Sequence, residues 1–481
     1  MNRLMPSFAM KKIAVSAALA GAAALVGLSA QAGVPIERWQ LPNGAQVYMA
    51  ATDALPIVDV QIDFDAGSRR DPPAQAGLAG VTAGMVEKGV RAEDCPSSAE
   101  RKNTSPFDGD GCRVPALDQN QLGEAWADLG AEFDVGASAD RMSFTLRSLA
   151  DPALLAKAVA LAAREIGEPS FPDDVWQRER ERLSAAIRES NTKPGTLASR
   201  AFGRDVYGGH PYGDDATEAT LAAISTADMR ARYAQTILPC RAKLTVVGAV
   251  TRAQADRIAS DLLARLPASV SNASGACPAL PPVAEVPPLA RAVTERIPFD
   301  SAQAHVLIGQ PGYARRNPDH FALTLGNYIL GGGGFVSRLT DEVREKRGLA
   351  YSVYSGFSPG LHAGAFRVGF QTRPDQADEA VKVARDVLAK FVADGPTEAE
   401  LKAAKDNLIG GFPLLMDSNR KLLGNVANIA WNDLPLDYLD TWTAKMNAVT
   451  VSDIKAAFAR TLQPEKMVTV VVGGAEPAAK K

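Results

Sequence analysis

The sequence predicts an α+β fold made of two homologous α/β-sandwich halves, each a largely antiparallel sheet packed with helices. Three observations lead to this prediction. The chain has 481 residues, which is more than one hydrophobic core usually serves. Two long segments match each other at a constant offset of 225 residues. Strand-like segments open each half and helix-like segments follow them, as in α+β proteins.

The internal repeat is the strongest of these signals. "ISTADM" (224–229) lies over "VTVSDI" (449–454), and "RYAQTILP" (232–239) lies over "AFARTLQP" (457–464). At the same offset "TVVG" (245–248) lies over "VVVG" (470–473). Each copy is typical of a helix that starts at Ser or Thr with Asp three residues on, followed by a buried β-branched strand. A gap-free match of this length predicts duplicated domains.

The strand signals come at the start of each half. "ERWQLPNGAQVYMA" contains an Asn-Gly hairpin turn at residues 43–44, and "VDVQIDF" follows with alternating polarity. "AQAHVLIGQPG" is the counterpart in the second half. The predicted layout is a signal peptide (1–32), an N-terminal domain (33–266), a Pro-rich linker (267–290), a C-terminal domain (291–476) and a tail (477–481).

The first residues have the pattern of an export signal. Arg3, Lys11 and Lys12 precede an apolar stretch (13–28), and Ala30-Gln31-Ala32 is a cleavage signal, so we expect a periplasmic or secreted protein cut after Ala32. The alternative is an uncleaved membrane anchor, for which the stretch is short. Met10 before two lysines is a second candidate start. No stable membrane insertion is expected after cleavage.

Charge and cysteine content narrow the function further. The formal net charge is −3, and removing the three cations of residues 1–32 makes it −6, so no basic face for nucleic acid is expected. The four cysteines are Cys95, Cys112, Cys240 and Cys277. In an oxidising compartment their order along the chain favours the disulfides Cys95–Cys112 and Cys240–Cys277. No Cys-x-x-Cys pair is present.

Common catalytic signatures are absent from the sequence. It contains no Gly-x-Ser-x-Gly elbow, P-loop or dinucleotide fingerprint. The four histidines are His210, His305, His320 and His362, and none stands three or four residues from another. No helical zinc pair is therefore possible, and each histidine is more typical of a surface or a satisfied core position.

Taken together, several segments resemble the pitrilysin/insulinase family of zinc metallopeptidases, which includes the mitochondrial processing peptidase. The segments are "LPNGAQV", "DAGSRRDPPAQAGLAGVTAGM", "GGHPYG" (208–213) and "YILGGGGFVSRLTDEVREKRGLAYSVYS" (328–355). The resemblance covers about residues 37–475. It implies the duplicated fold described above. The polar segment 91–114, with Cys95 and Cys112 in it, departs from the family and is interpreted as a surface insertion, either tolerated or touching a partner.

The resemblance also implies a metal site that has lost its ligands. The family's zinc helix carries His-x-x-Glu-His after Gly-Leu-Ala, and here Gly80, Ala83 and Gly84 stand at the His, Glu and His positions. The third ligand, a later glutamate, falls near Ala185 and Ala186. No cofactor is therefore expected on this chain, and zinc is expected in a catalytic partner. Gly80 and Gly84 could also let another helix pack closely against this one.

The second half keeps a different part of the family's machinery. Arg344 precedes Gly348, a predicted helix cap, and Tyr351 follows at a predicted strand start near residue 350. An Arg/Tyr pair at this spacing implies, by resemblance, contacts with the substrate and the developing oxyanion at the zinc site of the opposite half. The glycine run Gly331, Gly332, Gly333 and Gly334 is either a turn between helices or the family's substrate-handling loop.

These features predict a non-catalytic subunit of an exported zinc metallopeptidase. The chain would be inactive alone and active in a heterodimer with a homologous subunit, the four homologous domains enclosing a peptide-binding chamber. Arg344 and Tyr351 would act on the partner's active site. Two alternatives remain: a structural or peptide-binding protein with no proteolytic role, and an autonomous metallopeptidase, against which the histidine count argues. A peptide substrate is the expected ligand of the subunit.

Overall fold

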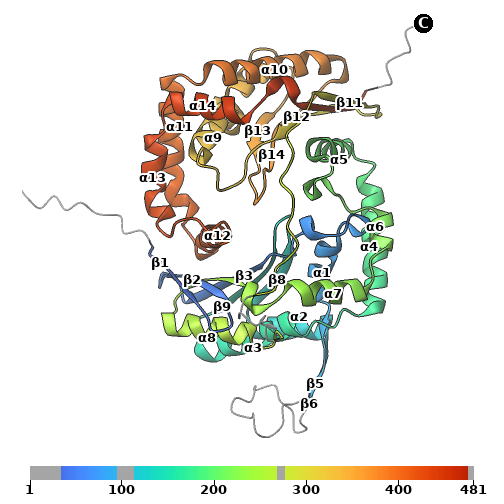
Figure 1. The fold of residues 1–481 in the computed structure, drawn as a ribbon, viewed down its shortest axis with the longest axis vertical. Helices are drawn as coiled ribbons and strands as arrows, with labels where there is room; N and C mark the ends of the chain where they lie inside the picture. The colour runs from blue at the N-terminus through green and yellow to red at the C-terminus, as the bar shows by residue number, and fades with distance from the viewer. Residues whose placement is uncertain (1–33, 95–112, 268–276, 475–481) are drawn as a thin grey trace, which may run out of the picture. The chain divides into compact units, whose positions relative to one another are not determined.

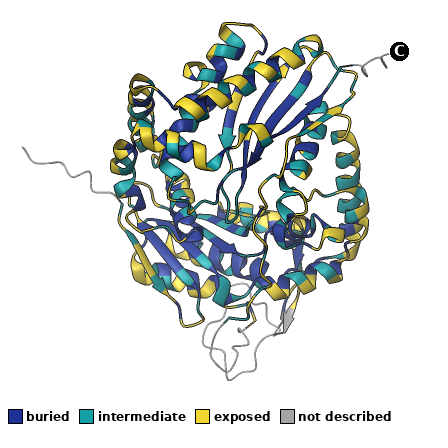
Figure 2. Ribbon diagram, turned by 45° about the horizontal axis from the view of Figure 1, so that its top comes forward, coloured by how far each residue is buried: buried dark blue, intermediate teal, exposed yellow. Residues whose placement is uncertain are grey.

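The computed structural model describes residues 34–94, 113–267 and 277–474. We call residues 34–267 the first half and residues 277–474 the second half. Each half contains one large sheet flanked by helices (Figure 1). The strands are largely buried and the outer helix faces are exposed, so each sheet lies inside its half (Figure 2). The α+β prediction is confirmed.

The first half has a six-stranded sheet in the order β1-β2-β10-β3-β9-β8. Its strand β10 runs parallel to β2, and all other neighbours are antiparallel. The strands are β1 (Ile36–Gln40), β2 (Gln46–Ala51), β3 (Ile57–Phe64), β8 (Glu132–Ala137), β9 (Met142–Leu149) and β10 (Lys243–Gly248). Two short pairs, β4 (Gly89–Val90) with β7 (Leu117–Asp118) and β5 (Glu93–Asp94) with β6 (Arg113–Val114), lie outside this sheet.

The second half has a five-stranded sheet in the order β11-β15-β12-β14-β13. Here β15 runs parallel to β11 and antiparallel to β12. Its strands are β11 (Val293–Ile297), β12 (Ala304–Pro311), β13 (Val353–Phe357), β14 (Ala365–Thr372) and β15 (Val468–Val472). Each sheet is therefore mainly antiparallel with a single parallel pair, as a duplicated fold requires.

The helices are described by half. Those of the first half are α1 (Leu78–Val86), α2 (Gln119–Leu129), α3 (Pro152–Gly167), α4 (Asp173–Ser190), α5 (Pro194–Tyr207), α6 (Glu218–Ala222), α7 (Thr226–Thr236) and α8 (Arg252–Leu263). Those of the second half are α9 (His320–Asn327), α10 (Ala377–Asp394), α11 (Glu398–Gly411), α12 (Asn419–Trp431), α13 (Tyr438–Ala448) and α14 (Val451–Thr461).

The offset of 225 residues reappears as an offset between structural elements. Five elements of the first half have an equivalent in the second half: α3 and α10, α4 and α11, α5 and α12, α7 and α14, and β10 and β15. The first members begin at residues 152, 173, 194, 226 and 243, and the second members begin at 377, 398, 419, 451 and 468. Each second number is the first plus 225. The match of the two halves thus begins earlier than the sequence segments first indicated. The repeat is confirmed at the level of helix starts.

Helix caps explain why equivalent helices begin at equivalent residues in the two halves. Ser225 and Thr450 each accept a hydrogen bond from the backbone N–H three residues on, and the carboxylates of Asp228 and Asp453 accept one from the N–H of the cap residue. Such a cap is worth about 0.5–2 kcal/mol, and it fixes where each helix begins.

Two equivalent helices, one from each half, pack on the sheet of the other half. Helix α12 packs on β10, β3 and β2 of the first sheet, and α5 packs on β12 and β15 of the second (Figure 1). Val426 of α12 is buried with Tyr48 and Val247. Phe202 of α5 is buried with Val470. Each sheet therefore has a face covered by the other half, and the two halves share their cores.

The packing of α12 on the first sheet explains the burial of β3. The alternating sequence of this strand is typical of one with a solvated face. Six of its eight residues are buried, including Asp59 and Asp63. Their carboxylates accept hydrogen bonds from Arg147 at 2.8 Å and Arg141 at 3.0 Å, so the buried charges are paired.

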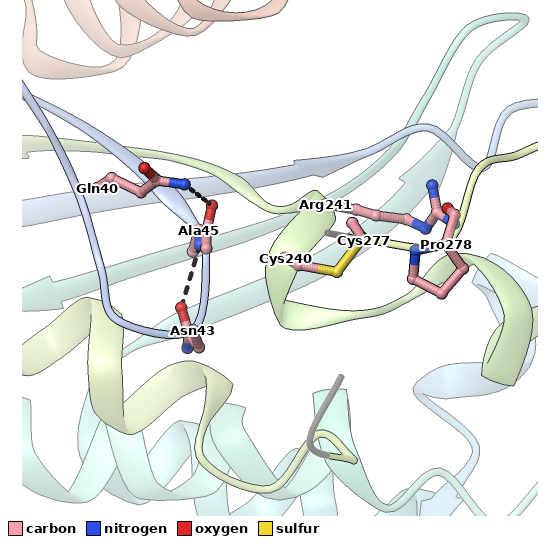
Figure 3. Close-up of a disulfide and its surroundings, with 8 residues drawn as sticks. Gln40, Asn43, Ala45, Cys240, Arg241, Cys277 and Pro278 are labelled. Atoms are coloured by element: carbon pink, nitrogen blue, oxygen red, sulfur yellow. Dashed lines mark hydrogen bonds between the residues drawn. A yellow bond between two sulfur atoms is a disulfide. The ribbon is translucent and has the colours of Figure 1, made fainter. Parts of the chain in front are cut away.

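One predicted disulfide is present and the other lies outside the described residues. Cys240 and Cys277 are bonded, 37 residues apart, and Arg241 donates a hydrogen bond to the carbonyl of Pro278 beside them (Figure 3). This bridge ties the start of the described linker to the first half. Cys95 and Cys112 fall in the segment that the structure does not describe.

Candidate functional site

Helix α1 is the helix that the sequence resemblance identifies with the family's zinc helix, and its two glycines face open space. Gly80 and Gly84 are exposed, and no described atom lies within 4 Å of a Cβ built at either position. Seven of its nine residues are buried, Ala83 among them. The interpretation of Gly80 and Gly84 as a close-packing motif is therefore wrong: no described element lies against this face.

The rest of α1 is held firmly. The buried carboxylate of Asp71 accepts hydrogen bonds from the backbone N–H groups of Gly77 at 3.2 Å and Ala79 at 3.1 Å. Burial raises the pKa of Asp71 to about 6, against the opposing effect of these bonds. At the other end Glu87 accepts a hydrogen bond from the N–H of Val135 on β8. Helix α1 is therefore held at both ends, although Gly80, Ala83 and Gly84 carry no side-chain atom that could bind a metal.

The position of the third ligand is also bare. Ala185 and Ala186 lie on α4 and are exposed. Lys88, just after α1, lies 3.8 Å from Glu179 of α4. Among the described residues no group of three or more His, Cys, Asp or Glu side chains could hold a metal ion. Hydrogen atoms and methyl groups cannot coordinate zinc, so these positions do not fit the family's metal.

The histidines do not replace the missing ligands. His210 is buried, its Nδ1 accepts a hydrogen bond from the N–H of Tyr212, and its Nε2 lies 3.0 Å from the carbonyl of Ala284. His362 lies 3.0 Å from Glu285. His320 contacts the Tyr313 hydroxyl, and His305 lines a cavity near the start of α5. His210 and His362 lie side by side, with ring centres 5.4 Å apart, but they are not part of any described group of three or more side chains that could hold a metal ion.

The predicted Arg/Tyr pair is brought together. The guanidinium carbon of Arg344 lies 5.2 Å from the ring centre of Tyr351 and 4.6 Å from that of Phe335. The guanidinium is thus in cation–π contact with two aromatic rings. Tyr351 is 83% exposed and Phe335 is 72% exposed. Both rings are exposed, whereas the Arg344 side chain is partly covered and lies 3.4 Å from the Glu345 carboxylate.

Local turns hold this arrangement. Arg344 lies in a π-helix, η7 (Thr340–Glu345), and the turn after this helix reaches Gly348, whose φ of 62° favours glycine. The N–H of Gly348 donates to the carbonyl of Arg344 at 2.8 Å. The strand β13 begins at Val353, so Tyr351 precedes the strand rather than starting it. Its ring is freer to meet a ligand than a strand residue would be.

The glycine run is a packed element rather than a loose turn. Gly331 and Gly332 end a π-helix, η5 (Tyr328–Gly332), and a Cβ at Gly331 would lie 2.6 Å from the backbone nitrogen of Ser355. Gly334 has φ of 62°. Asn327 and Ser355 exchange hydrogen bonds that fix η5 to β13. The glycines let the chain pass close to the strand and then present Phe335.

Phe335 was missed by the sequence reasoning. It directly follows the glycine run, and a large aromatic residue in "GGGGFVSR" is the signal that could have found it. Val336, its neighbour, is 76% exposed. An exposed apolar pair beside a guanidinium is typical of a surface that meets another molecule.

Comparison with known proteins shows the family to which the chain belongs. Residues 223–408 match the family described as the peptidase M16 inactive domain. The crystal structure of the peptidase M16 inactive domain from Pseudomonas fluorescens is 33% identical in sequence, with a TM-score of 0.81, and the alignment covers 92% of this chain and 99% of that one. The chain belongs to the M16 peptidase family. The resemblance to pitrilysin-like peptidases is thereby confirmed.

Two further relatives differ in what their names state. An uncharacterized zinc protease of Streptomyces coelicolor is 37% identical over 164 residues, which are 34% of this chain and 35% of that protein. The matched region thus spans about a third of that M16 relative. The non-peptidase homolog YmxG of Helicobacter pylori is 22% identical over 406 residues, 83% of this chain and 85% of that protein. Similar chains therefore bear both peptidase and non-peptidase names.

Proposed function

We propose that this M16 protein is a non-catalytic subunit that binds peptide and supplies Arg344 and Tyr351 to the zinc site of a homologous partner. The observation that carries the proposal is the contrast between its two halves. The first half keeps an intact α1 whose ligand positions are bare and open. The second half keeps Arg344 in contact with an exposed Tyr351. Donors of this kind stabilise charge that develops when a nucleophile attacks, so they serve catalysis only where another group supplies that nucleophile.

The roles of the two side chains follow from their chemistry. A guanidinium in contact with two rings is a positioned donor of charge-assisted hydrogen bonds to a carbonyl oxygen that becomes negative, and this oxygen would compete with Glu345, which lies 3.4 Å from the guanidinium. The phenol of Tyr351 is a second donor beside it. Donors that are already in place cost little reorganisation when the charge develops, which lowers the barrier to peptide cleavage. Zinc on the partner would supply the activated water when bound.

The proposal also includes export and heterodimer formation. The export signal lies in residues 1–32, outside the described part of the chain. Among the described residues no helix is long and apolar enough to span a bilayer. The exposed Phe335 and Val336 would be covered when the partner or the peptide binds. Each half would then contribute to an enclosed peptide-binding space.

The test is a kinetic comparison in the assembled complex. Arg344→Ala and Tyr351→Phe should each lower kcat about 10²–10³-fold, as loss of one oxyanion donor does, with the complex still assembled. Arg347→Ala is the matched control, because Arg347 is exposed and pairs with Glu342 on the same segment. Wild-type rates in both pair variants would refute the proposed role.

A second candidate function is a scaffold or peptide-binding protein without any proteolytic role. The name of the Helicobacter pylori relative favours it. The same kinetic experiment separates the two functions, because a scaffold would leave the rates unchanged. Chelator-sensitive hydrolysis by the pure chain would instead support an autonomous peptidase and would contradict both.

A further inference from the structure

A second cavity lies in the second half, at the start of α9. Its volume is about 610 Å³, which is enough for a small organic molecule or the end of a peptide. It is formed by the loop before α9, the segment 434–438, and the helices α13 and α14. The glycine run follows the other end of α9, so this cavity is built from different residues than the Arg/Tyr site.

Two cations in this cavity have no acidic partner. The Arg315 guanidinium donates a hydrogen bond to the Tyr438 hydroxyl at 2.8 Å and lies 5.3 Å from its ring centre. The Lys445 ammonium lies 5.8 Å from the same ring and 5.9 Å from the ring of Phe321. No described carboxylate lies within ion-pair distance of either cation. Both side chains are only partly exposed, so their charges are less screened than surface charges.

The acidic residues of the cavity are already engaged. Asp319 forms an ion pair with Arg460 at 2.8 Å. Asp453 caps the start of α14 by accepting bonds from Thr450. The remaining lining cation, Arg316, pairs with Asp433. Asp453 keeps its negative charge, so Arg315, Lys445 and Asp453 together leave one net positive charge in the cavity, in a chain whose formal net charge is −3.

His320 adds polarity to the cavity but no charge. Its Nδ1 lies 3.0 Å from the hydroxyl of Tyr313. Burial, together with the nearby Arg315, lowers the pKa of His320 to about 3, so the ring is neutral at physiological pH. His320 therefore adds no positive charge to the cavity at that pH.

We propose that this cavity binds a carboxylate attached to an apolar body. The carboxylate would lie between Arg315 and Lys445, and the body would pack on Phe321 and the neighbouring Leu434 and Pro435. Two sources share this chemistry: a free organic acid, and the C-terminal carboxylate of a peptide. The site does not depend on the zinc-bearing partner, so it can be tested on the chain alone.

The test is a titration of the purified chain with 3-phenylpropionate, followed by calorimetry and ligand-observed NMR. The neutral 3-phenylpropionamide and inorganic sulfate are the comparison probes. Saturable binding of the carboxylate is expected, at least tenfold tighter than the amide and than sulfate, since charge-assisted bonds contribute about 1.5–3 kcal/mol. A peptide ending in Phe-COOH against the same peptide amidated distinguishes the two sources.

The variants assign the binding to the cavity. Lys445→Met should weaken the carboxylate at least tenfold and Lys445→Arg should retain it, while Lys390→Met, an exposed lysine on α10, is the matched control. The Lys445 ammonium makes no hydrogen bond to a described residue, so its loss should leave the fold intact. Binding that is absent at 10 mM, equal for acid and amide, equal for sulfate, or unchanged in Lys445→Met would overturn the proposal.

Discussion

The exposed glycines of α1 offer a sharp prediction about stability. Because a Cβ at Gly80 or Gly84 would contact no described atom, alanine should fit without strain at both positions. Each exchange should stabilise the helix by about 0.5–1 kcal/mol, since glycine loses more backbone entropy on folding than alanine does. The double variant should therefore gain about 1–2 kcal/mol.

Native-state hydrogen exchange of the α1 amides is the most direct assay for this gain. An increase of about 1–2 kcal/mol in opening free energy corresponds to exchange about 5–30-fold slower. The melting temperature should rise only slightly, because a chain of this size has a large unfolding entropy.

Gly331→Ala is the matched control for the α1 variants. A Cβ there would lie 2.6 Å from the backbone nitrogen of Ser355, so this exchange should destabilise the protein by about 1–3 kcal/mol. Faster exchange, or lower stability, in the Gly80→Ala/Gly84→Ala variant would refute the reasoning. It would mean that this face is packed, and that the glycines are kept for contact.

Three further predictions concern the fold. Leu423→Ala on α12 and Phe202→Ala on α5 should each cost about 2–5 kcal/mol, and urea unfolding should show both halves weakened together, because each helix is buried against the other half's sheet. Burial raises the pKa of Glu165 to about 8. Between about pH 4.5 and 8 the folded state therefore holds a proton that the unfolded state has released, so the free energy of unfolding falls as the pH rises through this range. Glu165→Gln should remove this slope of at most about 1.4 kcal/mol per pH unit in denaturation curves measured from pH 5 to 8. The Cys240→Ser/Cys277→Ser variant should lose about 3–4 kcal/mol in urea unfolding, the chain-entropy value for a loop of 37 residues; an unchanged midpoint would contradict the cross-link's role.

The duplicated fold could be predicted because its signals are local. Caps such as Ser225 and Thr450 sit at equivalent positions, and the distance between the copies never changes. The packing of α5 and α12 on the sheets of the opposite halves could not be predicted. Each has an ordinary amphipathic pattern, and such a pattern indicates that a helix is covered without indicating which sheet covers it.

The candidate site could be predicted only in part, because some of its residues are close in the sequence and others meet only in the fold. The spacing of Arg344 and Tyr351 could be recognised in the sequence, but the third member, Phe335, comes from before η7 and meets them only in the fold. The direction in which Gly80 and Gly84 point also depends on tertiary packing. A sequence shows that small residues occupy ligand positions, whereas only the structure shows that the space beside them is open.

The central claim is that this M16 chain works with a homologous zinc-bearing subunit. A pull-down of the tagged mature chain from its native source, with bound proteins identified by mass spectrometry, tests it most directly. The account predicts recovery of a homologous chain with an intact His-x-x-Glu-His motif in near-equal amount. Recovery of this chain alone, under conditions that preserve known complexes, would contradict the claim.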